Sequence, residues 1–295
     1  MIEVKNLTKC FDGFKALDDL SLTVPTGAVY GLVGPNGAGK STVIRHMMGV
    51  YRPNAGEVLV DGQPVYENPA VKQKMVCIPD EIYYQTADTI KDLKELYRGI
   101  YPKFDIQRFE RLKEVFHLDE KKQVRRFSKG MQKQLAFWLA ISCRPEILVL
   151  DEPVDGLDPV MRRQIMSIIL EDVAENGTTV LVSSHNLREL EDICDHVGMM
   201  HQGKMLLERS LSALQENMVK VQLVMEDPLP AELEVVHHSA VGRVQTIIAR
   251  GNAEQIEEIF GKHNPLLCDI LPLSLEEVFI YELGGVDYEV KNVLL

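Results

Sequence analysis

The residues best suited to chemistry lie in a glycine-rich run and in a later pair of acidic residues. The run is Gly34-Pro35-Asn36-Gly37-Ala38-Gly39-Lys40-Ser41, between a strand-like and a helix-like apolar stretch. It predicts a phosphate-binding loop, because glycines let the backbone curl until successive N–H groups point at phosphate oxygens. Lys40 would approach the β- and γ-phosphates, and Ser41 would offer a hydroxyl to Mg²⁺ at a helix N-terminus that favours anions.

The acidic pair, Asp151-Glu152, directly follows the apolar run 147–150. Such a run is typical of a buried strand, and open α/β sheets hold their ligands at the carboxyl ends of the strands. A strand here would bring Asp151 to the metal and Glu152 to the water that attacks the phosphate. Together, the two motifs predict that the chain binds and splits a nucleoside triphosphate.

The elements that must position these residues can be predicted from the apolar pattern. Apolar residues recur at helical spacing from about 88 to 117, which predicts a helical insert between sheet segments. Shorter apolar or alternating runs, bounded by Gly and Pro, predict strands. The expected strands of this part are 2–8, 20–31 with a turn at 25–27, 57–60, 75–78, 147–150, 178–183 and 197–200.

The pattern changes beyond Ser210, where shorter elements follow one another closely. We expect a fold of the α/β class over residues 1–210, with a helical subdomain at about 82–145, and a separate small α+β domain over residues 211–295. The elements expected in this accessory domain are strands at 219–224, 234–238, 244–249 and 267–271, a helix at 253–262 and another from about 275.

Composition limits the class of protein. The net charge is −12, and residues 211–295 contribute much of it, with five Lys or Arg against fourteen Asp or Glu, which disfavours nucleic acid as a partner. We expect the chain to be neither secreted nor membrane-spanning by itself, because it has no apolar signal-like start and no run of about eighteen apolar residues. The five scattered cysteines argue against a disulfide framework or a zinc site: Cys10, Cys77, Cys143, Cys194 and Cys268.

A third segment, Phe127-Ser128-Lys129-Gly130-Met131-Gln132, precedes a helix-like run. Ser128 is a good N-cap, and helix capping alone would explain it. Because the segment lies shortly before the Asp-Glu pair, however, it resembles the signature motif of ABC ATPases. In this variant form, Lys129 and Met131 stand where Gly and Gln are commoner.

The order of motifs over residues 1 to about 210 resembles the nucleotide-binding subunit of an ABC transporter. Phe11 resembles the aromatic that stacks on adenine, although it could equally be a core residue. Residues 34–42 match the phosphate loop with its trailing Ser41-Thr42. Residues 154–159 resemble the D-loop, which contains Asp158. His185 resembles the switch histidine, and its alternative is an ordinary core histidine.

The resemblance implies ATP and Mg²⁺ as cofactors and a head-to-tail pair of ATPase subunits. Ser128 and Gly130 of one subunit would close the ATP held by the phosphate loop of the other. Glu152 would be the general base, His185 would contact the γ-phosphate, and Asp158 would link the two sites. Such an ATP-dependent pair would come apart after hydrolysis.

One position departs from the family pattern. In the loop after the strand at 75–78, Asp80 stands where the family usually has Gln. That Gln normally contacts Mg²⁺ and the water. A carboxylate could attract the metal but could not donate a hydrogen bond while ionised, so Asp80 is a candidate metal ligand or a solvated loop residue.

The resemblance implies an ATPase subunit that drives a separate transmembrane permease, in the exporter branch that moves drugs or amphipathic peptides. The helical insert, with Tyr83 and Tyr84 at its entrance, would receive the permease. The chain would then be cytoplasmic, reaching the membrane only through that partner. A soluble ABC ATPase acting on ribosomes or DNA is the alternative, but the chain has neither an internal repeat nor long heptads.

Overall fold

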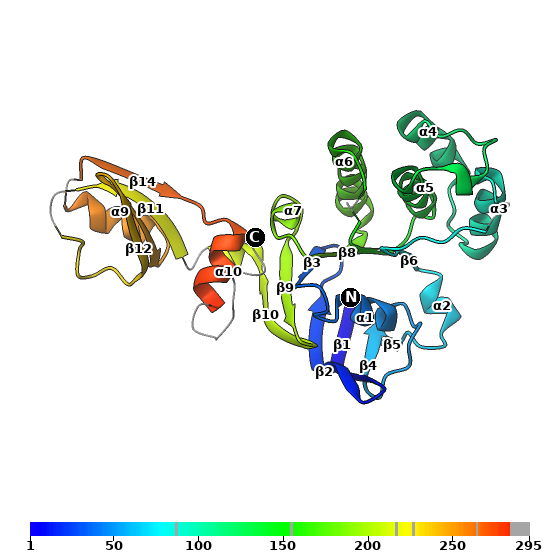
Figure 1. The fold of residues 1–295 in the computed structure, drawn as a ribbon, viewed down its shortest axis with the longest axis horizontal. Coiled ribbons are helices and arrows are strands. Elements are labelled where there is room, and N and C mark those ends of the chain that lie inside the picture. The colour runs from blue at the N-terminus through cyan, green and yellow to red at the C-terminus, as the bar shows by residue number, and fades with distance from the viewer. Residues whose placement is uncertain (86–87, 154–155, 216–217, 226–227, 264, 284–295) are drawn as a thin grey trace. The chain divides into compact units, whose positions relative to one another are not determined.

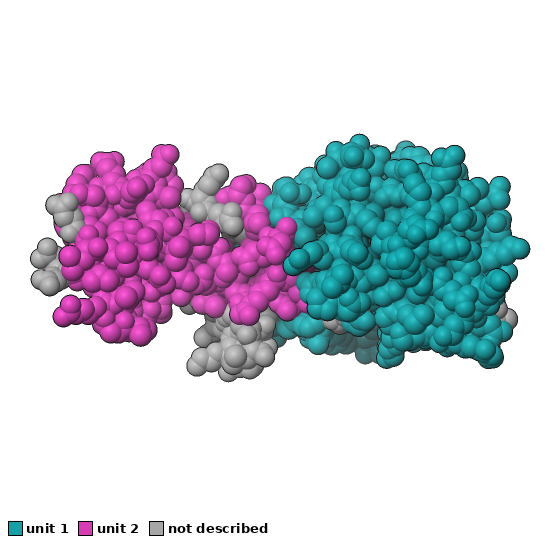
Figure 2. Space-filling model, turned by 90° about the horizontal axis from the view of Figure 1, so that it is seen from above, with its two compact units in different colours: residues 1–185, 193–208 teal, residues 186–192, 209–295 magenta. Residues whose placement is uncertain are grey.

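The chain divides into two compact units in the computed structural model, which describes residues 1–85, 88–153, 156–215, 218–225, 228–263 and 265–283. The first unit comprises residues 1–185 and 193–208, and the second comprises residues 186–192 and 209–295 (Figure 2). The short helix α7 (Arg188–Glu191) therefore groups with the C-terminal unit by its contacts. The division into domains at residues 1–210 and 211–295, with a helical subdomain at about 82–145, stays a prediction.

Two sheets build the first unit (Figure 1). One is antiparallel, with the strand order β2-β1-β4-β5, and the other has the order β10-β9-β3-β8-β7-β6. In the second sheet, the pairs that join β9, β3, β8, β7 and β6 are all parallel. The strands are β1 (Ile2–Phe11), β2 (Phe14–Val24), β3 (Val29–Val33), β4 (Ala55–Val60), β5 (Gln63–Pro64), β6 (Met75–Ile78), β7 (Ile147–Asp151), β8 (Thr179–Ser184), β9 (His196–His201) and β10 (Lys204–Ser210).

Helices cover both faces of the parallel sheet. Figure 1 shows α1 between the two sheets, and α5 and α6 on the opposite side of the parallel sheet. Every residue of β3, β7 and β8 is buried, which is why these strands read as continuous apolar runs. The helices of this unit are α1 (Lys40–Met47), α2 (Pro69–Lys72), α3 (Ile90–Ile100), α4 (Ile106–Phe116), the 3₁₀ helix Val124–Arg126, α5 (Lys129–Ser142) and α6 (Pro159–Asn176).

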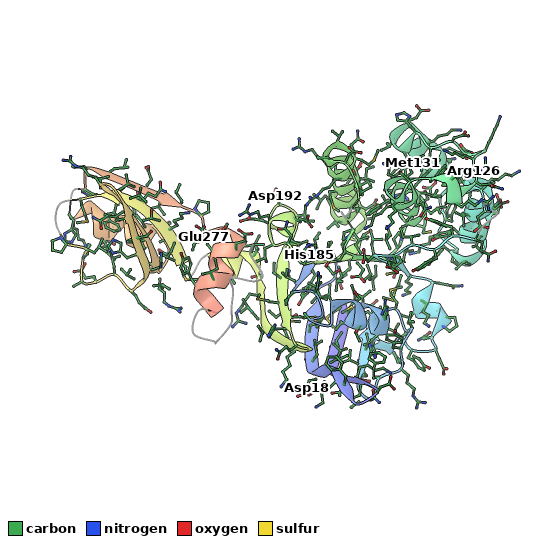
Figure 3. The ribbon with its side chains drawn as sticks, in the orientation of Figure 1. Asp18, Arg126, Met131, His185, Asp192 and Glu277 are labelled. Carbon is green, nitrogen blue, oxygen red and sulfur yellow. The ribbon has the colours of Figure 1, made fainter. Side chains whose placement is uncertain are left out.

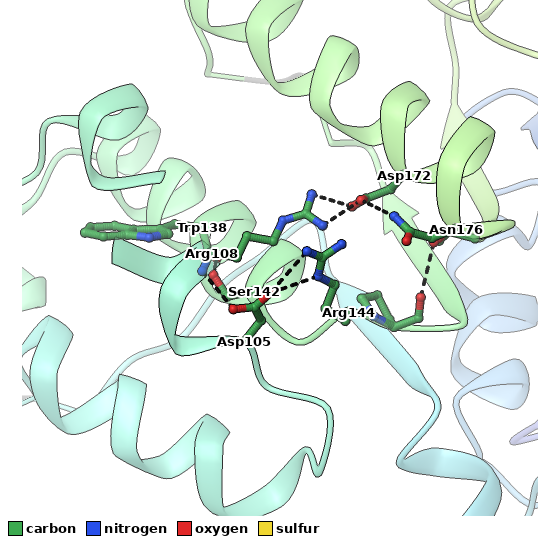
Figure 4. Close-up of polar contacts among 9 residues, drawn as sticks. Asp105, Arg108, Trp138, Ser142, Arg144, Asp172 and Asn176 are labelled. Carbon is green, nitrogen blue, oxygen red and sulfur yellow. Dashed lines mark hydrogen bonds and ion pairs between the residues drawn. The ribbon is translucent and has the colours of Figure 1, made fainter. Parts of the chain in front are cut away.

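The expected helical insert is present as α3 and α4, which pack with α5. Trp138 of α5 stacks on Phe109 and Phe116 of α4, and its indole N–H donates to the Phe109 carbonyl oxygen at 2.8 Å. A buried ion pair joins α4 to α6, where the Arg108 guanidinium donates to both carboxylate oxygens of Asp172 at 2.6 and 2.7 Å (Figure 4). The orientation of α5 therefore depends on α4 and, through it, on α6.

Although a separate accessory domain at residues 211–295 stays a prediction, the described part of the second unit contains both strands and helices. Its sheet has the order β12-β13-β11-β14 with antiparallel pairs, and its apolar core includes Val221, Leu223, Ile247 and Phe260. Among the described residues of the whole chain, no helix is both long and apolar enough to cross a membrane. The elements are α8 (Leu211–Gln215), β11 (Met218–Val224), β12 (Val235–Val241), β13 (Val244–Arg250), α9 (Ala253–Gly261), β14 (Leu267–Leu271) and α10 (Leu275–Leu283).

The first hairpin differs from the expectation. β1 extends beyond the strand expected at 2–8, β2 begins before the segment expected at 20–31 and ends at Val24, and the two strands pair as an antiparallel hairpin. Its turn is Asp12-Gly13, with φ of 46° and 86°. Two consecutive residues with positive φ are typical of a tight hairpin turn, so Asp-Gly was the overlooked signal.

Candidate active site

The glycine-rich run forms a tight loop between β3 and α1. Gly37 and Gly39 have φ of 83° and 106°, in the region where glycine is favoured. A side chain at Gly34 would overlap the carbonyl oxygen of Met200. The Ala38 N–H donates to the Pro35 carbonyl oxygen at 3.0 Å, which closes the turn. The loop therefore has a fixed shape that only glycine permits at these positions.

A cavity of about 380 Å³ lies against this loop. The Lys40 ammonium, which belongs to the same loop, is buried and donates to the Gly34 carbonyl oxygen at 2.7 Å. The α1 N-terminus, at Gly39, has no side-chain cap, so its N–H groups are open to an anion. The lining comprises Phe11, Phe14, Ala16, Asn36, Gly37, Ala38, Gly39, Lys40, Ser41, Thr42, Asp80 and Glu152.

The acidic pair lies at the carboxyl end of β7, beside β8. The Ser183 hydroxyl of β8 donates to Asp151 Oδ1 at 2.6 Å and accepts the Glu152 N–H at 3.0 Å. Asp151 is buried. The parallel pairing of β7 and β8 therefore fixes both acidic residues through one neighbouring hydroxyl, which the sequence motifs did not reveal.

Glu152 is the centre of a charged cluster. Its Oε2 lies 2.9 Å from His185 Nδ1, and its Oε1 lies 3.2 Å from the Lys40 ammonium nitrogen. Oε1 is nevertheless buried and has no hydrogen-bond partner among the described residues, because the contact with Lys40 lacks hydrogen-bond geometry. His185 itself is half-exposed, at the end of β8 (Figure 3). The cluster thus holds one carboxylate oxygen by an ion pair alone, without a hydrogen bond among the described residues.

A neighbouring cavity of about 770 Å³ is lined in part by three candidate oxygen ligands for Mg²⁺: Ser41, Asp80 and Asp151. Hydroxyl and carboxylate oxygens are the donors that Mg²⁺ prefers, together with the phosphates of a bound nucleotide. Cys77 lines the same cavity, but burial, with a contribution from Asp151, raises the pKa of its thiol to about 12. The thiol is therefore protonated near neutral pH, which leaves the oxygens as the candidate metal ligands.

The signature segment starts α5. The Ser128 hydroxyl accepts a hydrogen bond from the Met131 N–H at 3.2 Å and so caps the helix. Met131 is labelled in Figure 3. A Cβ on Gly130 would lie 2.5 Å from the Gly156 carbonyl oxygen, so only glycine fits there. Ser128, Lys129, Gly130 and Met131 are absent from the lining of the phosphate-loop cavity of their own chain.

The D-loop segment is described only in part, since Val154 and Asp155 lie outside the described residues. Asp158 is the N-cap of α6 and accepts the N–H groups of Val160 and Met161 at 3.1 and 3.0 Å. The contact that the family resemblance assigns to Asp158 involves a second subunit and stays a prediction.

The hairpin of β1 and β2 brings two aromatic rings to the cavity. Phe11 and Phe14 pair across its turn, with exposed fractions of 38% and 68%. Phe11 contacts Tyr51 edge to face, with ring centroids 5.4 Å apart, and the Lys9 ammonium lies 5.2 Å from its centroid. The sequence motifs pointed to Phe11 but missed Phe14, because the strand pairing was not recognised.

Comparison with known proteins agrees with this geometry. Residues 17–155 match the family model described as ABC transporter. The ABC transporter ATP-binding protein YtrB of Bacillus subtilis is 32% identical, over 97% of this chain and 99% of YtrB. The chain belongs to the ABC transporter ATP-binding subunits. The bacitracin transport ATP-binding protein BcrA of Bacillus licheniformis is 30% identical to this ABC subunit over 97% of the chain and 98% of BcrA.

A solved structure supports the fold of the ABC subunit. It is the ATP-binding subunit of an ABC transporter, with a TM-score of 0.68 and 27% identity, over 73% of this chain and 92% of that one. The ABC subunit is therefore a nucleotide-binding ATPase with the phosphate-loop fold.

Proposed function

We propose that this ABC subunit dimerises on ATP and powers a separate transmembrane permease that exports amphipathic peptides or drugs. The observation that carries the proposal is the meeting of Lys40, Glu152 and His185 beside the phosphate loop. Nucleotide hydrolysis needs a positive charge for the phosphates and a carboxylate that can accept a proton, and Lys40 and Glu152 supply these groups with a polar ring beside them.

Each group has a distinct role in the proposed reaction. The loop N–H groups and Lys40 hold the triphosphate, and the phosphates compete with Glu152 for the Lys40 ammonium. Ser41 and Asp151, with Asp80 in the same lining, would hold Mg²⁺, which would neutralise phosphate charge. Glu152 Oε1 accepts a proton from the attacking water, and His185 orients that carboxylate and contacts the γ-phosphate.

The second ATPase subunit, identical or related, completes each site. Ser128 and Lys129 are exposed and lie outside the cavity of their own chain, as expected of groups that serve another chain. ATP between the two subunits supplies the negative charge that draws the opposite α5 N-terminus inward. Hydrolysis removes that bridge, so each cycle closes and opens the pair.

A permease is the proposed membrane partner, and the subunit would be peripheral at the cytoplasmic face. Two exposed residues line the 770 Å³ cavity beside Asp80: Tyr83, with an exposed fraction of 84%, and Val50, with 63%. Arg45 and Tyr101 also belong to its lining. Aromatic and arginine side chains are enriched at protein interfaces. The name of BcrA, a bacitracin transport protein, supports a peptide cargo. The acidic composition favours neither DNA nor RNA.

Reconstitution tests the whole proposal. The chain and its permease are placed in lipid vesicles, and ATP turnover is measured with and without a cyclic peptide antibiotic such as bacitracin. Turnover that rises with the peptide, together with ATP-dependent movement of the peptide, is expected. Lys40→Ala in the same complex should lose ATP binding and both activities, because the buried ammonium is the main cation of the loop. Turnover that the permease never affects would contradict the coupling.

A further inference from the structure

The main chain of Glu152 has an uncommon conformation. Its φ is 46°, in the left-handed region that residues with a side chain adopt rarely and at some cost in energy. Such a conformation persists only where the surroundings hold it, and it is commoner at functional sites than elsewhere. It also sets the direction in which the Glu152 carboxylate leaves the end of β7. The groups that hold this backbone therefore also aim the carboxylate.

Two hydrogen bonds hold the Glu152 backbone from opposite sides. The N–H donates to the Ser183 hydroxyl of β8 at 3.0 Å. The carbonyl oxygen accepts from the Lys133 ammonium of α5 at 2.6 Å. Lys133 has an exposed fraction of only 5%, so its ammonium is removed from water. A charge-assisted hydrogen bond in a buried place is strong, and it requires this long side chain to be present.

The same face of α5 makes a second contact with this segment. Gly130 lies one helical turn before Lys133, and its Cα approaches the Gly156 carbonyl so closely that a Cβ would be 2.5 Å from that oxygen. One helix face thus rests on the backbone of Glu152 and of Gly156. The helix that carries the signature residues therefore also touches the segment that carries the base of its own chain.

We propose that Lys133 is a positioning residue for hydrolysis: its ammonium holds the left-handed backbone of Glu152 and so aims the carboxylate at the attacking water. The proposal rests on the role of Glu152 as general base. Helix α5 would then act on both sites: Ser128 at its start contacts the ATP of the opposite subunit, and Lys133 positions Glu152 of its own chain.

The test is a comparison of side chains at position 133 in the full chain. Lys133→Met keeps an unbranched stem but removes the donor, and should lower kcat by about 10- to 100-fold because small displacements of a catalytic group are costly. Lys133→Gln keeps a donor on a stem one bond shorter and should lose less. In both variants the affinity for ATP, measured with Mg²⁺ absent, should stay within about twofold of the parent, because Lys133 does not line the phosphate-loop cavity. Lys121→Met, an exposed lysine on the preceding loop, is the matched control and should behave as the parent.

Non-additivity separates a positioning role from general damage. In a Glu152→Gln background, Lys133→Met should cause almost no further loss, because the group that it aims is already gone. Parent-like kcat in Lys133→Met, or in Lys133→Gln if the Met variant does not fold, would overturn the inference. A double variant in which Lys133→Met lowers kcat as much as it does in the parent would also overturn the inference. If Glu152→Gln alone keeps its turnover, the proposed base is wrong, and that failure is distinct from a failure of Lys133.

Discussion

The two units of the chain differ in where they place their charges. In the first unit, Lys40, Arg108, Lys133, Asp151 and Asp172 are all buried. In the described part of the second unit, no charged side chain is buried. Burial of a charge costs free energy unless the charge is paired or hydrogen-bonded, so a unit that keeps several has a use for them.

The buried charges of the first unit fall into two groups. Lys40 and Asp151 lie at the proposed nucleotide and metal sites, and Lys133 touches the backbone of the proposed base. Arg108 and Asp172 lie outside the linings of both proposed sites and join α4 to α6, the helix that begins next to the D-loop residue Asp158. The second unit has partly exposed pairs such as Lys220 with Glu277. The comparison indicates that the buried charges of this protein lie either at or next to the proposed reaction site or at a contact that fixes one helix against another.

The largest stability effect is expected at the Arg108–Asp172 pair. Arg108→Met leaves Asp172 buried without its main partner, which should lower the free energy of unfolding by about 3–5 kcal/mol. Chemical denaturation of the full chain measures it. The double variant Arg108→Met with Asp172→Leu should recover much of the loss, because no uncompensated charge remains. A loss below about 1 kcal/mol in the single variant would mean that the pair is effectively solvated, and the contrast between the units would weaken.

The smallest effect is expected in the second unit, at the pair that joins β11 to α10. The Lys220 ammonium lies 2.6 Å from Glu277 Oε1, and both side chains are about a quarter exposed. Lys220→Met should lower the free energy of unfolding by only about 0.2–1 kcal/mol, since solvent screens a pair of this kind. ATP turnover should stay unchanged. A loss as large as that of Arg108→Met would show that the second unit also depends on its charges.

Sequence reasoning reached the motif residues but not the contacts made by packing. The glycine-rich run and the Asp-Glu pair are local patterns with a direct physical meaning, so the loop and the strand end could be placed in advance. The strands of the second unit were predicted from the alternation of apolar and polar residues and from the Gly and Pro residues between them. Lys133 and Phe14 were missed, because nothing local distinguishes a lysine inside a helix or a phenylalanine after a turn. Their roles depend on which segment lies opposite.

Long-range pairing explains the other gaps. Arg108 and Asp172 are 64 residues apart, and no spacing rule joins them. The grouping of α7 with the C-terminal unit likewise depends on distant contacts, including the Arg188–Glu276 ion pair at 3.0 Å and the Leu275 N–H donating to Glu191 Oε1 at 3.0 Å. Periodicity predicts single elements well, whereas the partner of each element is decided by the whole fold.

The most direct test of the account is Glu152→Gln in the purified chain with Mg²⁺ and ATP. Gln keeps the size of the side chain but cannot accept the proton, so turnover should fall by about 10²–10⁴-fold while ATP still binds. The variant should then accumulate as an ATP-dependent dimer in light scattering. Glu146→Gln, at a half-exposed acid just before β7, is the matched control and should keep parent turnover. Near-normal hydrolysis by Glu152→Gln would contradict the assignment of the base and the mechanism built on it.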